Sequence, residues 1–156
     1  MKMKKAVCSI FVILAFLMFG NSSVYACSCP TVVGLEQELK WKLKALQAVF
    51  SGEVLEINKV PQSRDVSVKI KVETVWKGSL FKEVTISTPD HPGSCGYPFQ
   101  IGESYVVFAS LSDTKTLTTG LCLKNIEVKK AIEELKILGK GKKPSSKAFL
   151  PSAERV

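Results

Sequence analysis

The stretch DVSVKIKVETVW, residues 65–76, carries the clearest strand signal in this sequence. Its apolar side chains Val66, Val68, Ile70 and Val72 alternate with serine, lysine and glutamate. An alternation with a period of two places apolar side chains on one face of a strand and polar ones on the other. We therefore predict a strand over 65–76 with one face buried and the other in contact with water.

Four further segments on either side of this strand have the composition of strands. Residues 48–57 are rich in valine, phenylalanine and isoleucine, and Gly52 lies where a barrel strand can bend. Residues 83–88, 104–110 and 117–123 follow downstream. Five short strands with short connections favour a closed or nearly closed barrel over a doubly wound sheet, so the expected fold class is mainly β.

Two helices are expected to flank the strands. Before the first strand, leucines at helical spacing predict an amphipathic helix of about three turns. These leucines are Leu35, Leu39, Leu43 and Leu46. A second helix is expected from an N-cap at Asn125 to Leu138, with Gly139 ending it. Trp41 and Trp76 are interpreted as core residues.

The first 26 residues have the features of a secretory signal peptide. A basic segment, residues 1–5, precedes the apolar run 6–20, which is too short to span a bilayer comfortably. Val24 and Ala26 provide aliphatic or small residues at the two positions that signal peptidase recognises. We expect cleavage after Ala26, export, and a mature chain that begins at Cys27.

Charge is distributed unevenly along the mature chain. Removal of residues 1–26 takes away three lysines, so the formal charge falls from +8 to +5. Residues 139–156 carry five basic side chains and one glutamate, a charge of +4, which leaves +1 for residues 27–138. We therefore divide the mature chain into a nearly neutral domain, 27–138, and a basic tail, 139–156, which is expected to be disordered.

The mature chain keeps four cysteines, Cys27, Cys29, Cys95 and Cys122. An even number of cysteines in an exported chain predicts two disulfides, and the sequence alone allows three pairings. A zinc site made of four thiolates fits less well, because paired C-x-x-C motifs are missing and the compartment is oxidising. We therefore expect two disulfides and no bound metal.

Cys27 also admits a lipoprotein alternative, in which cleavage occurs before a lipid-modified cysteine. Tyr25 lies where that recognition sequence requires a small residue. Lipidation would also consume the Cys27 sulfur and leave three thiols, one of them unpaired. We therefore expect a secreted extracellular protein, with a lipid anchor at Cys27 as the alternative.

Four motifs occur together in this chain: CSCP at 27–30, VFSGEV at 49–54, VWKG at 75–78, and SCGY at 94–97 followed by F-x-x-G-x-x-Y. In this combination the sequence resembles the tissue inhibitors of metalloproteinases and, more widely, the netrin-like domains. The resemblance covers about residues 27–122. The chain departs from that family because it lacks the third disulfide of the amino-terminal domain and the whole carboxy-terminal subdomain.

The resemblance implies an OB-type barrel of five strands, with Cys27 paired to Cys95 and Cys29 paired to Cys122. It also implies inhibition of zinc metalloendopeptidases, in which the amine and carbonyl oxygen of Cys27 displace the water on the target's zinc. Neighbouring residues would contact the protease along the same ridge. These residues are Ser28, Cys29, Pro30, Gly93 and Ser94.

We accordingly expect a monomer with no catalytic activity, no cofactor and no metal of its own. His91, the only histidine, is interpreted as a loop residue, because Cys95 is expected to be oxidised and no activating partner is evident. A nearly neutral domain also disfavours nucleic acid as a partner. The alternative function is a non-inhibitory netrin-like module that attaches to a cell surface, a partner protein or, through the basic tail, an anionic polymer.

Overall fold

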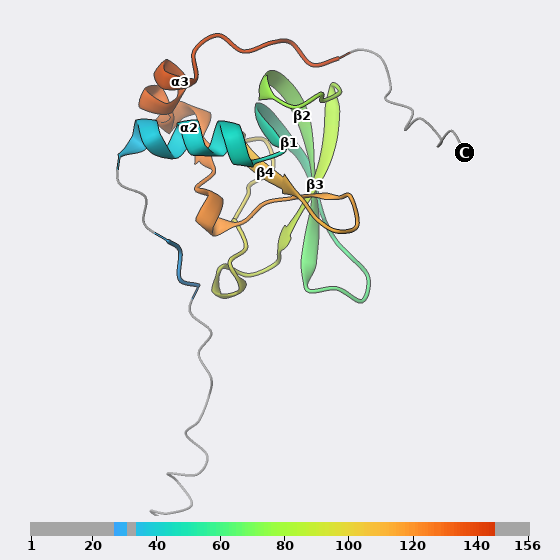
Figure 1. Ribbon diagram of the computed structural model, residues 1–156. Helices are drawn as coiled ribbons and strands as arrows, with labels where there is room; N and C mark the ends of the chain where they lie inside the picture. Colours follow the sequence, from blue (N-terminus) through green and yellow to red (C-terminus); the bar gives the residue numbers. More distant parts are fainter. Residues whose placement is uncertain (1–26, 31–33, 146–156) are drawn as a thin grey trace, which may run out of the picture.

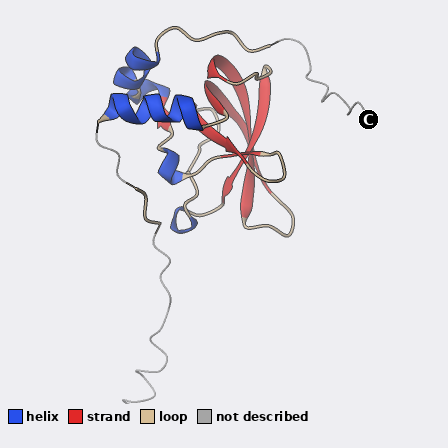
Figure 2. Ribbon diagram, in the orientation of Figure 1, coloured by secondary structure: helices blue, strands red, loops and turns tan. Residues whose placement is uncertain are grey.

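The computed structural model describes residues 27–30 and 34–145, and the expected signal peptide lies outside these ranges. A strand-rich body lies beside two helices (Figures 1 and 2). Its strands are β1 (Ala48–Lys59), β2 (Asp65–Lys77), β3 (Glu83–Pro89), β4 (Ser104–Leu111), β5 (Leu117–Thr118) and β6 (Ile126–Glu127). Its helices are α2 (Leu35–Ala45) and α3 (Ile132–Leu138), with 3-10 turns η1 (Pro92–Ser94), η2 (Leu121–Leu123) and η3 (Val128–Lys130). Within the described residues, neither α2 nor α3 has the length and apolar character that crossing a bilayer requires.

Five strands form one closed sheet. Around the ring, β1, β2, β3, β5 and β4 are each hydrogen-bonded to the next, and β4 closes onto β1. Neighbouring strands are antiparallel except β3 and β5, which meet in parallel at Ser87 and Thr118. The short strand β6 pairs with β4 at Tyr105 and Val106. This order confirms the expected five-stranded OB-type barrel with flanking helices.

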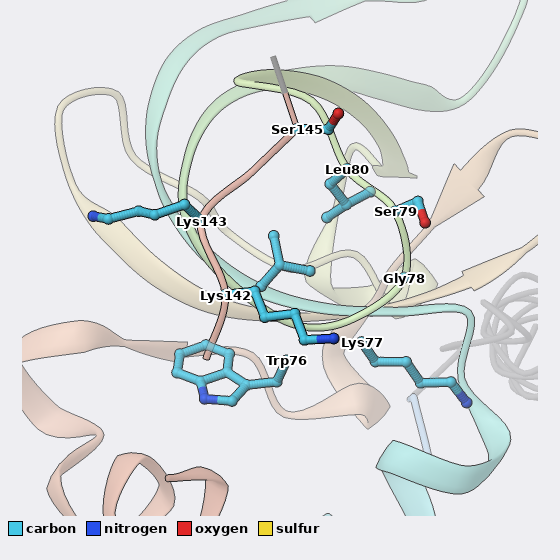
Figure 3. A pocket seen from close by; sticks show the side chains of 9 residues that line it. Trp76, Lys77, Gly78, Ser79, Leu80, Lys142, Lys143 and Ser145 are labelled. Atoms are coloured by element: carbon cyan, nitrogen blue, oxygen red, sulfur yellow. The ribbon is translucent and has the colours of Figure 1, made fainter. Parts of the chain in front are cut away.

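Residues 139–145 differ from the disordered tail that the sequence predicts. Val75 and Lys142 exchange two backbone hydrogen bonds, each 2.8 Å between nitrogen and oxygen, in the region drawn in Figure 3. The Ser145 amide donates to the Leu80 carbonyl oxygen at 2.7 Å. Because β3 does not pair with this part of β2, the edge of β2 is open there and the segment occupies it. The ordered domain therefore extends to Ser145 and does not end at 138, and the rest of the expected tail lies outside the described residues.

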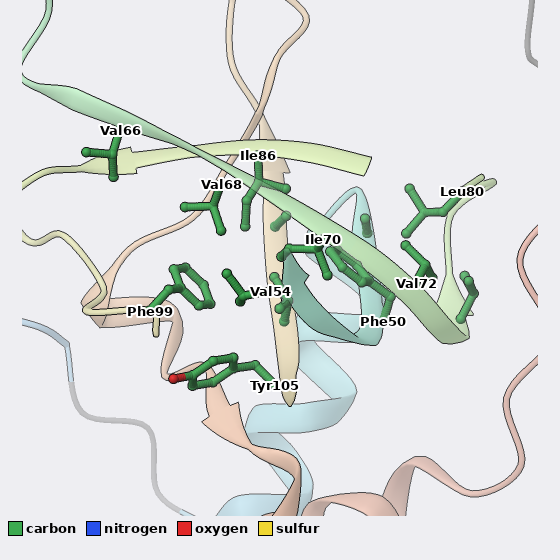
Figure 4. Close-up of a cluster of buried hydrophobic side chains, with 14 residues drawn as sticks. Phe50, Val54, Val66, Val68, Ile70, Val72, Leu80, Ile86, Phe99 and Tyr105 are labelled. Carbon is green, nitrogen blue, oxygen red and sulfur yellow. The ribbon is translucent and has the colours of Figure 1, made fainter. Parts of the chain in front are cut away.

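The alternation of apolar and polar residues in 65–76 corresponds to an alternation of buried and more exposed side chains along β2. Its four alternating apolar side chains are buried in the barrel, where they pack with side chains of the other strands (Figure 4). On β1, Phe50 belongs to this barrel cluster, whereas its neighbour Val49 belongs to a second apolar cluster beneath the helices. Successive strand residues face opposite sides, so the first five residues of β1, 48–52, are buried on both faces. The second cluster consists of Leu39, Leu46, Val49, Val106, Phe108 and Ala131.

Two segments fold differently from the expectation. Only the first two residues of the expected strand 117–123 pair, as β5, and the chain then turns into η2. Asn125 does not cap a helix, because its buried Oδ1 accepts a hydrogen bond from the Phe108 amide at 2.9 Å. That bond attaches Asn125 to β4, so the chain continues as β6 and η3 before α3 begins at Ile132.

The first predicted helix is present as α2, but one of its aromatic residues is not in the core. Leu39 is buried and packs beneath the helix, whereas Trp41 is 52% exposed. Residues two apart on a helix do not share a face, so burial of Leu39 directs Trp41 away from the barrel. The core interpretation is therefore wrong for Trp41, while Trp76 is partly buried against the helix-side cluster.

A buried ion pair within α2 packs against Phe108 of the barrel strand β4. Glu38 and Lys42 are 6% and 3% exposed, and Lys42 Nζ lies 2.8 Å from Glu38 Oε1 and 4.0 Å from the centre of the Phe108 ring. Lys124 Nζ contacts the other Glu38 oxygen at 2.7 Å. Burial alone would raise the pKa of Glu38, but the hydrogen bonds from Lys124 and Lys42 outweigh it and hold the pKa below its ordinary value of 4.5.

Substitution of Glu38 by leucine is expected to destabilise the protein by about 3 kcal/mol, because it leaves the buried Lys42 ammonium without its nearest carboxylate. Adding Lys42→Met should recover most of this loss. Urea unfolding at pH 7 measures both changes. Because its pKa is lowered by folding, the Glu38 contribution is present above pH 4.5 and decreases as the pH falls below that value.

The same helix supplies a matched control for this prediction. Glu36 and Lys40 form an ion pair of the same spacing at 2.7 Å, but their side chains are 65% and 71% exposed. Solvent and salt screen such a pair, so Glu36→Leu should leave the urea midpoint unchanged. Equal destabilisation by Glu36→Leu and Glu38→Leu would contradict the account of burial given above.

Candidate functional site

The first described residues, 27–30, are joined to the barrel by two disulfides. Cys27 is bonded to Cys95 and Cys29 to Cys122, with Cα–Cα distances of 5.2 and 5.0 Å. This confirms the pairing implied by the resemblance. All four sulfurs are used in these bonds, so they form no four-thiolate zinc site. The two disulfides are adjacent, because Cys27 Sγ lies 3.6 Å from Cys122 Sγ.

The loop that carries Cys95 is held in shape by His91. The Nδ1 atom of His91 accepts a hydrogen bond from the Gly93 amide at 3.0 Å, and its carbonyl oxygen accepts one from the Ser94 amide at 2.9 Å. Cys95 then takes a left-handed conformation, with φ at 66°, and its amide donates to the Pro92 carbonyl oxygen at 2.9 Å. His91 therefore acts as the N-cap of η1, which agrees with its interpretation as a loop residue.

The loop that carries Cys122 contacts the Cys95 loop directly. The Leu121 amide donates to the Cys95 carbonyl oxygen at 2.7 Å. At Gly120 the backbones approach so closely that a Cβ atom would lie 2.7 Å from the same oxygen. The two loops that anchor residues 27–30 are thus bonded to each other, and each anchor restrains the other.

We call residues 27–30 together with Gly93 and Ser94 the N-terminal ridge. Ser28, Pro30 and Ser94 are exposed, while Cys27, Cys29 and Gly93 are partly buried. Gly93 and Ser94 immediately precede Cys95, so the first disulfide brings Cys27 to their turn. The Ser28 carbonyl oxygen lies 3.9 Å from Cys122 Sγ. The backbone of the ridge is therefore restrained between the two disulfides, while several of its side chains remain accessible to a partner.

An apolar hollow that the sequence analysis missed adjoins the ridge. Its apolar lining consists of Pro30, Trp41 and Leu123. Cys122 and the charged side chains of Glu38, Lys42 and Lys124 complete the wall, and the volume is about 400 Å³. Trp41 lies two residues after Leu39 and outside the stripe formed by Leu35, Leu39 and Leu43, and this spacing was a signal for an exposed aromatic residue. Because Pro30 belongs to both the ridge and the hollow, the surface available to a partner continues from the ridge into the hollow.

A chain that begins at Cys27 carries two potential metal ligands at its first residue. The α-amine nitrogen and the carbonyl oxygen are separated by two carbon atoms, so both can approach one metal ion in a five-membered chelate ring. Such a chelate can reach only a metal that has an open coordination position, as catalytic zinc does. This chemistry requires cleavage of the bond after Ala26, since the nitrogen is otherwise part of a peptide bond.

No protein-family model matches the sequence, and a search of curated proteins found no match. The resemblance to the tissue inhibitors of metalloproteinases therefore rests on the four motifs quoted above. Of these motifs, CSCP and SCGY meet in the structure at the Cys27–Cys95 disulfide.

Proposed function

We propose that the mature chain is a secreted, monomeric inhibitor of zinc metalloendopeptidases. The observation that carries this proposal is the attachment of both Cys27 and Cys29 to two loops that are hydrogen-bonded to each other. A chain terminus usually frays unless it is tied down. Here the terminal residues would keep one conformation before and after binding.

In the proposed mechanism the α-amine and carbonyl oxygen of Cys27 bind the zinc ion of the target protease. A catalytic zinc has three protein ligands and one position occupied by water, and the metal activates that water for attack on the peptide bond. The chelate would displace this water and so remove the nucleophile. The inhibitor itself needs neither a metal nor a catalytic residue.

The rest of the N-terminal ridge would occupy the substrate cleft beside the zinc. Ser28 follows the chelating residue and is exposed, so it is the natural candidate for the pocket that receives the residue after the cleaved bond. Gly93 and Ser94 would flank it from the neighbouring loop. Preorganisation by the disulfides supports tight binding, because little conformational entropy remains to be lost on docking.

The experiment that tests this proposal is an inhibition assay with secreted protein of verified terminus. Mass analysis should show a chain that begins at Cys27 with an unmodified amine and four oxidised sulfurs. This protein should inhibit zinc endopeptidases competitively with substrate. A diacylglyceryl group on Cys27, or no inhibition across a panel of secreted zinc endopeptidases, would favour the alternative of a non-inhibitory binding module.

Inhibition is expected to weaken as the pH falls, because the amine must be unprotonated to donate its electron pair. α-Amino groups titrate near pH 8, so the fraction of competent inhibitor should fall roughly fiftyfold between pH 8 and pH 6. The measurement is the inhibition constant against a protease that is active over this range, corrected for its own activity at each pH. A constant that stays the same from pH 8 to 6 contradicts chelation by the amine.

A further inference from the structure

A second hollow, away from the residues assigned to the ridge, lies between the end of β2, the turn that follows it and residues 139–145 (Figure 3). Its volume is about 500 Å³. Its wall combines apolar side chains with lysines and serines. The residues that line it are Val75, Trp76, Lys77, Gly78, Ser79, Leu80, Lys142, Lys143 and Ser145.

The wall formed by residues 139–145 is held at three points. Trp76 Nε1 donates to the Gly139 carbonyl oxygen at 2.8 Å, Val75 and Lys142 exchange backbone hydrogen bonds, and the Ser145 amide binds the Leu80 carbonyl oxygen. These bonds use the Trp76 indole and the backbone, so the lysine side chains do not take part in them. The hollow therefore has a defined shape that does not depend on its charged groups.

Within the described residues, the charged side chains that line this hollow are all positive. Lys77, Lys142 and Lys143 line it, and none of its lining residues is acidic. Among the ion pairs of the described residues none involves these three lysines, whereas Lys42, Lys69 and Lys129 elsewhere are paired with carboxylates. In Figure 3 the Lys142 side chain extends across the hollow and that of Lys143 points outward.

Lys77 is positioned by a hydrogen bond rather than by a carboxylate. Its Nζ donates to the Lys44 carbonyl oxygen at the end of α2, at 2.8 Å. That bond fixes the ammonium at one side of the hollow, and no carboxylate in residues 27–30 or 34–145 forms an ion pair with it. Ser79, which is exposed, adds a hydroxyl donor on the same turn. Ammonium and hydroxyl donors around a concave surface are a combination that suits phosphate or sulfate oxygens.

We propose that this lysine hollow binds the phosphate or sulfate groups of a linear polyanion. The lysines lie at the surface, so salt screens their attraction for a single small anion, which would therefore bind weakly. A chain of regularly spaced charges can contact the three lysines together and release several counterions. The site is distinct from the N-terminal ridge, and polyanion binding does not depend on whether the protein inhibits a protease.

The test compares two double variants of the full mature chain that lose the same charge. Lys142→Gln with Lys143→Gln alters the hollow, while Lys71→Gln with Lys115→Gln removes two exposed lysines that do not line it. Binding to long-chain polyphosphate and to a sulfated polysaccharide is measured by calorimetry and by salt elution. The first variant should lose at least about tenfold in affinity, and the second less than about twofold.

Additional arms of the experiment identify the ligand. Inorganic phosphate should compete only at high concentration, a neutral polysaccharide should not bind, and the ratio of the two polymer affinities assigns phosphate or sulfate. Unchanged Trp76 fluorescence, recorded in a Trp41→Phe background so that Trp76 is the one tryptophan, verifies that the hollow is intact in each variant. Equal losses in the two variants, or binding to anionic phospholipid vesicles without binding to either soluble polymer, would overturn the proposal.

Discussion

One alanine added before Cys27 should weaken protease inhibition by at least about a hundredfold, which corresponds to roughly 3 kcal/mol of binding free energy. The added residue converts the Cys27 amine into an amide, whose nitrogen has no available electron pair for zinc. It also places extra atoms where the zinc and its ligands would lie. Inhibition constants of the extended and unextended proteins against the same protease provide the measurement.

The control for this experiment is an alanine added after Val156, at the other end of the chain. It changes the length equally and should leave inhibition unchanged. Chemical acetylation of the Cys27 amine at a pH that spares lysines should reproduce the effect of the N-terminal alanine. The added alanine precedes Cys27 and Cys29, so both disulfides can still form and the barrel should keep its stability. Thermal unfolding of all forms checks this expectation.

This prediction separates the two proposed functions of the protein. A non-inhibitory binding module would tolerate the added alanine, because its partner would recognise another surface. Binding of polyanions at the lysine hollow should also survive the extension. Full inhibitory potency in the extended protein would rule out chelation through the amine and direct attention to the apolar hollow that contains Trp41.

Removal of either disulfide should cost about 4 kcal/mol of stability, which is a large part of the total for a domain of this size. The bonds link residues 68 and 93 positions apart, and closing such long loops removes much of the entropy of the unfolded chain. The two loops overlap, so the losses in a protein that lacks both bonds should not add. Urea unfolding of Cys27→Ala/Cys95→Ala and of Cys29→Ala/Cys122→Ala measures each loss.

The first of these double variants also tests the role of rigidity. The alanine that replaces Cys27 would still carry an α-amine and a carbonyl oxygen, so both proposed zinc ligands remain. Inhibition should nevertheless fall at least about tenfold, because ordering a free terminus on the protease consumes binding energy. Full potency without the Cys27–Cys95 bond would mean that preorganisation of the ridge has no part in inhibition. For the unfolding experiment, a loss of stability below about 1 kcal/mol would contradict the explanation by loop-closure entropy.

Several elements follow directly from local patterns in the sequence. The alternation in β2 and the leucine spacing in α2 are properties of neighbouring residues. The first predicts the correct buried positions for Val66, Val68, Ile70 and Val72, whereas the second is correct for Leu39 but also selects Leu35, which is exposed at the start of the helix. The segment 117–123 shows the limit of this reasoning. Its apolar composition suits a strand, but Gly120 packs against the Cys95 backbone and the Leu121 amide is bonded there, so the chain leaves the sheet.

The misassigned residues share one physical cause. Asn125 has the chemistry of a helix cap, but its side chain is used by the Phe108 amide of a distant strand. Trp41 is large and apolar, yet the burial of Leu39 on another face of the helix leaves it exposed. Residues 139–145 lack the apolar side chains of a strand, but their backbone completes an open edge of β2. In each case a contact between segments far apart in the sequence prevails over a local preference.

By itself, the sequence determined the strands β1 to β4 and the helix α2, which face of β2 is buried, and that four cysteines remain if the chain is cleaved after Ala26. Only the tertiary structure decided which of three possible disulfide pairings forms, how residues 27–30 meet the Cys95 and Cys122 loops, and which lysines surround the second hollow. Strand and helix patterns depend on the geometry of consecutive residues, which sequence spacing records. Pairing across the barrel depends on many simultaneous contacts between distant residues, and no local pattern in the chain records those.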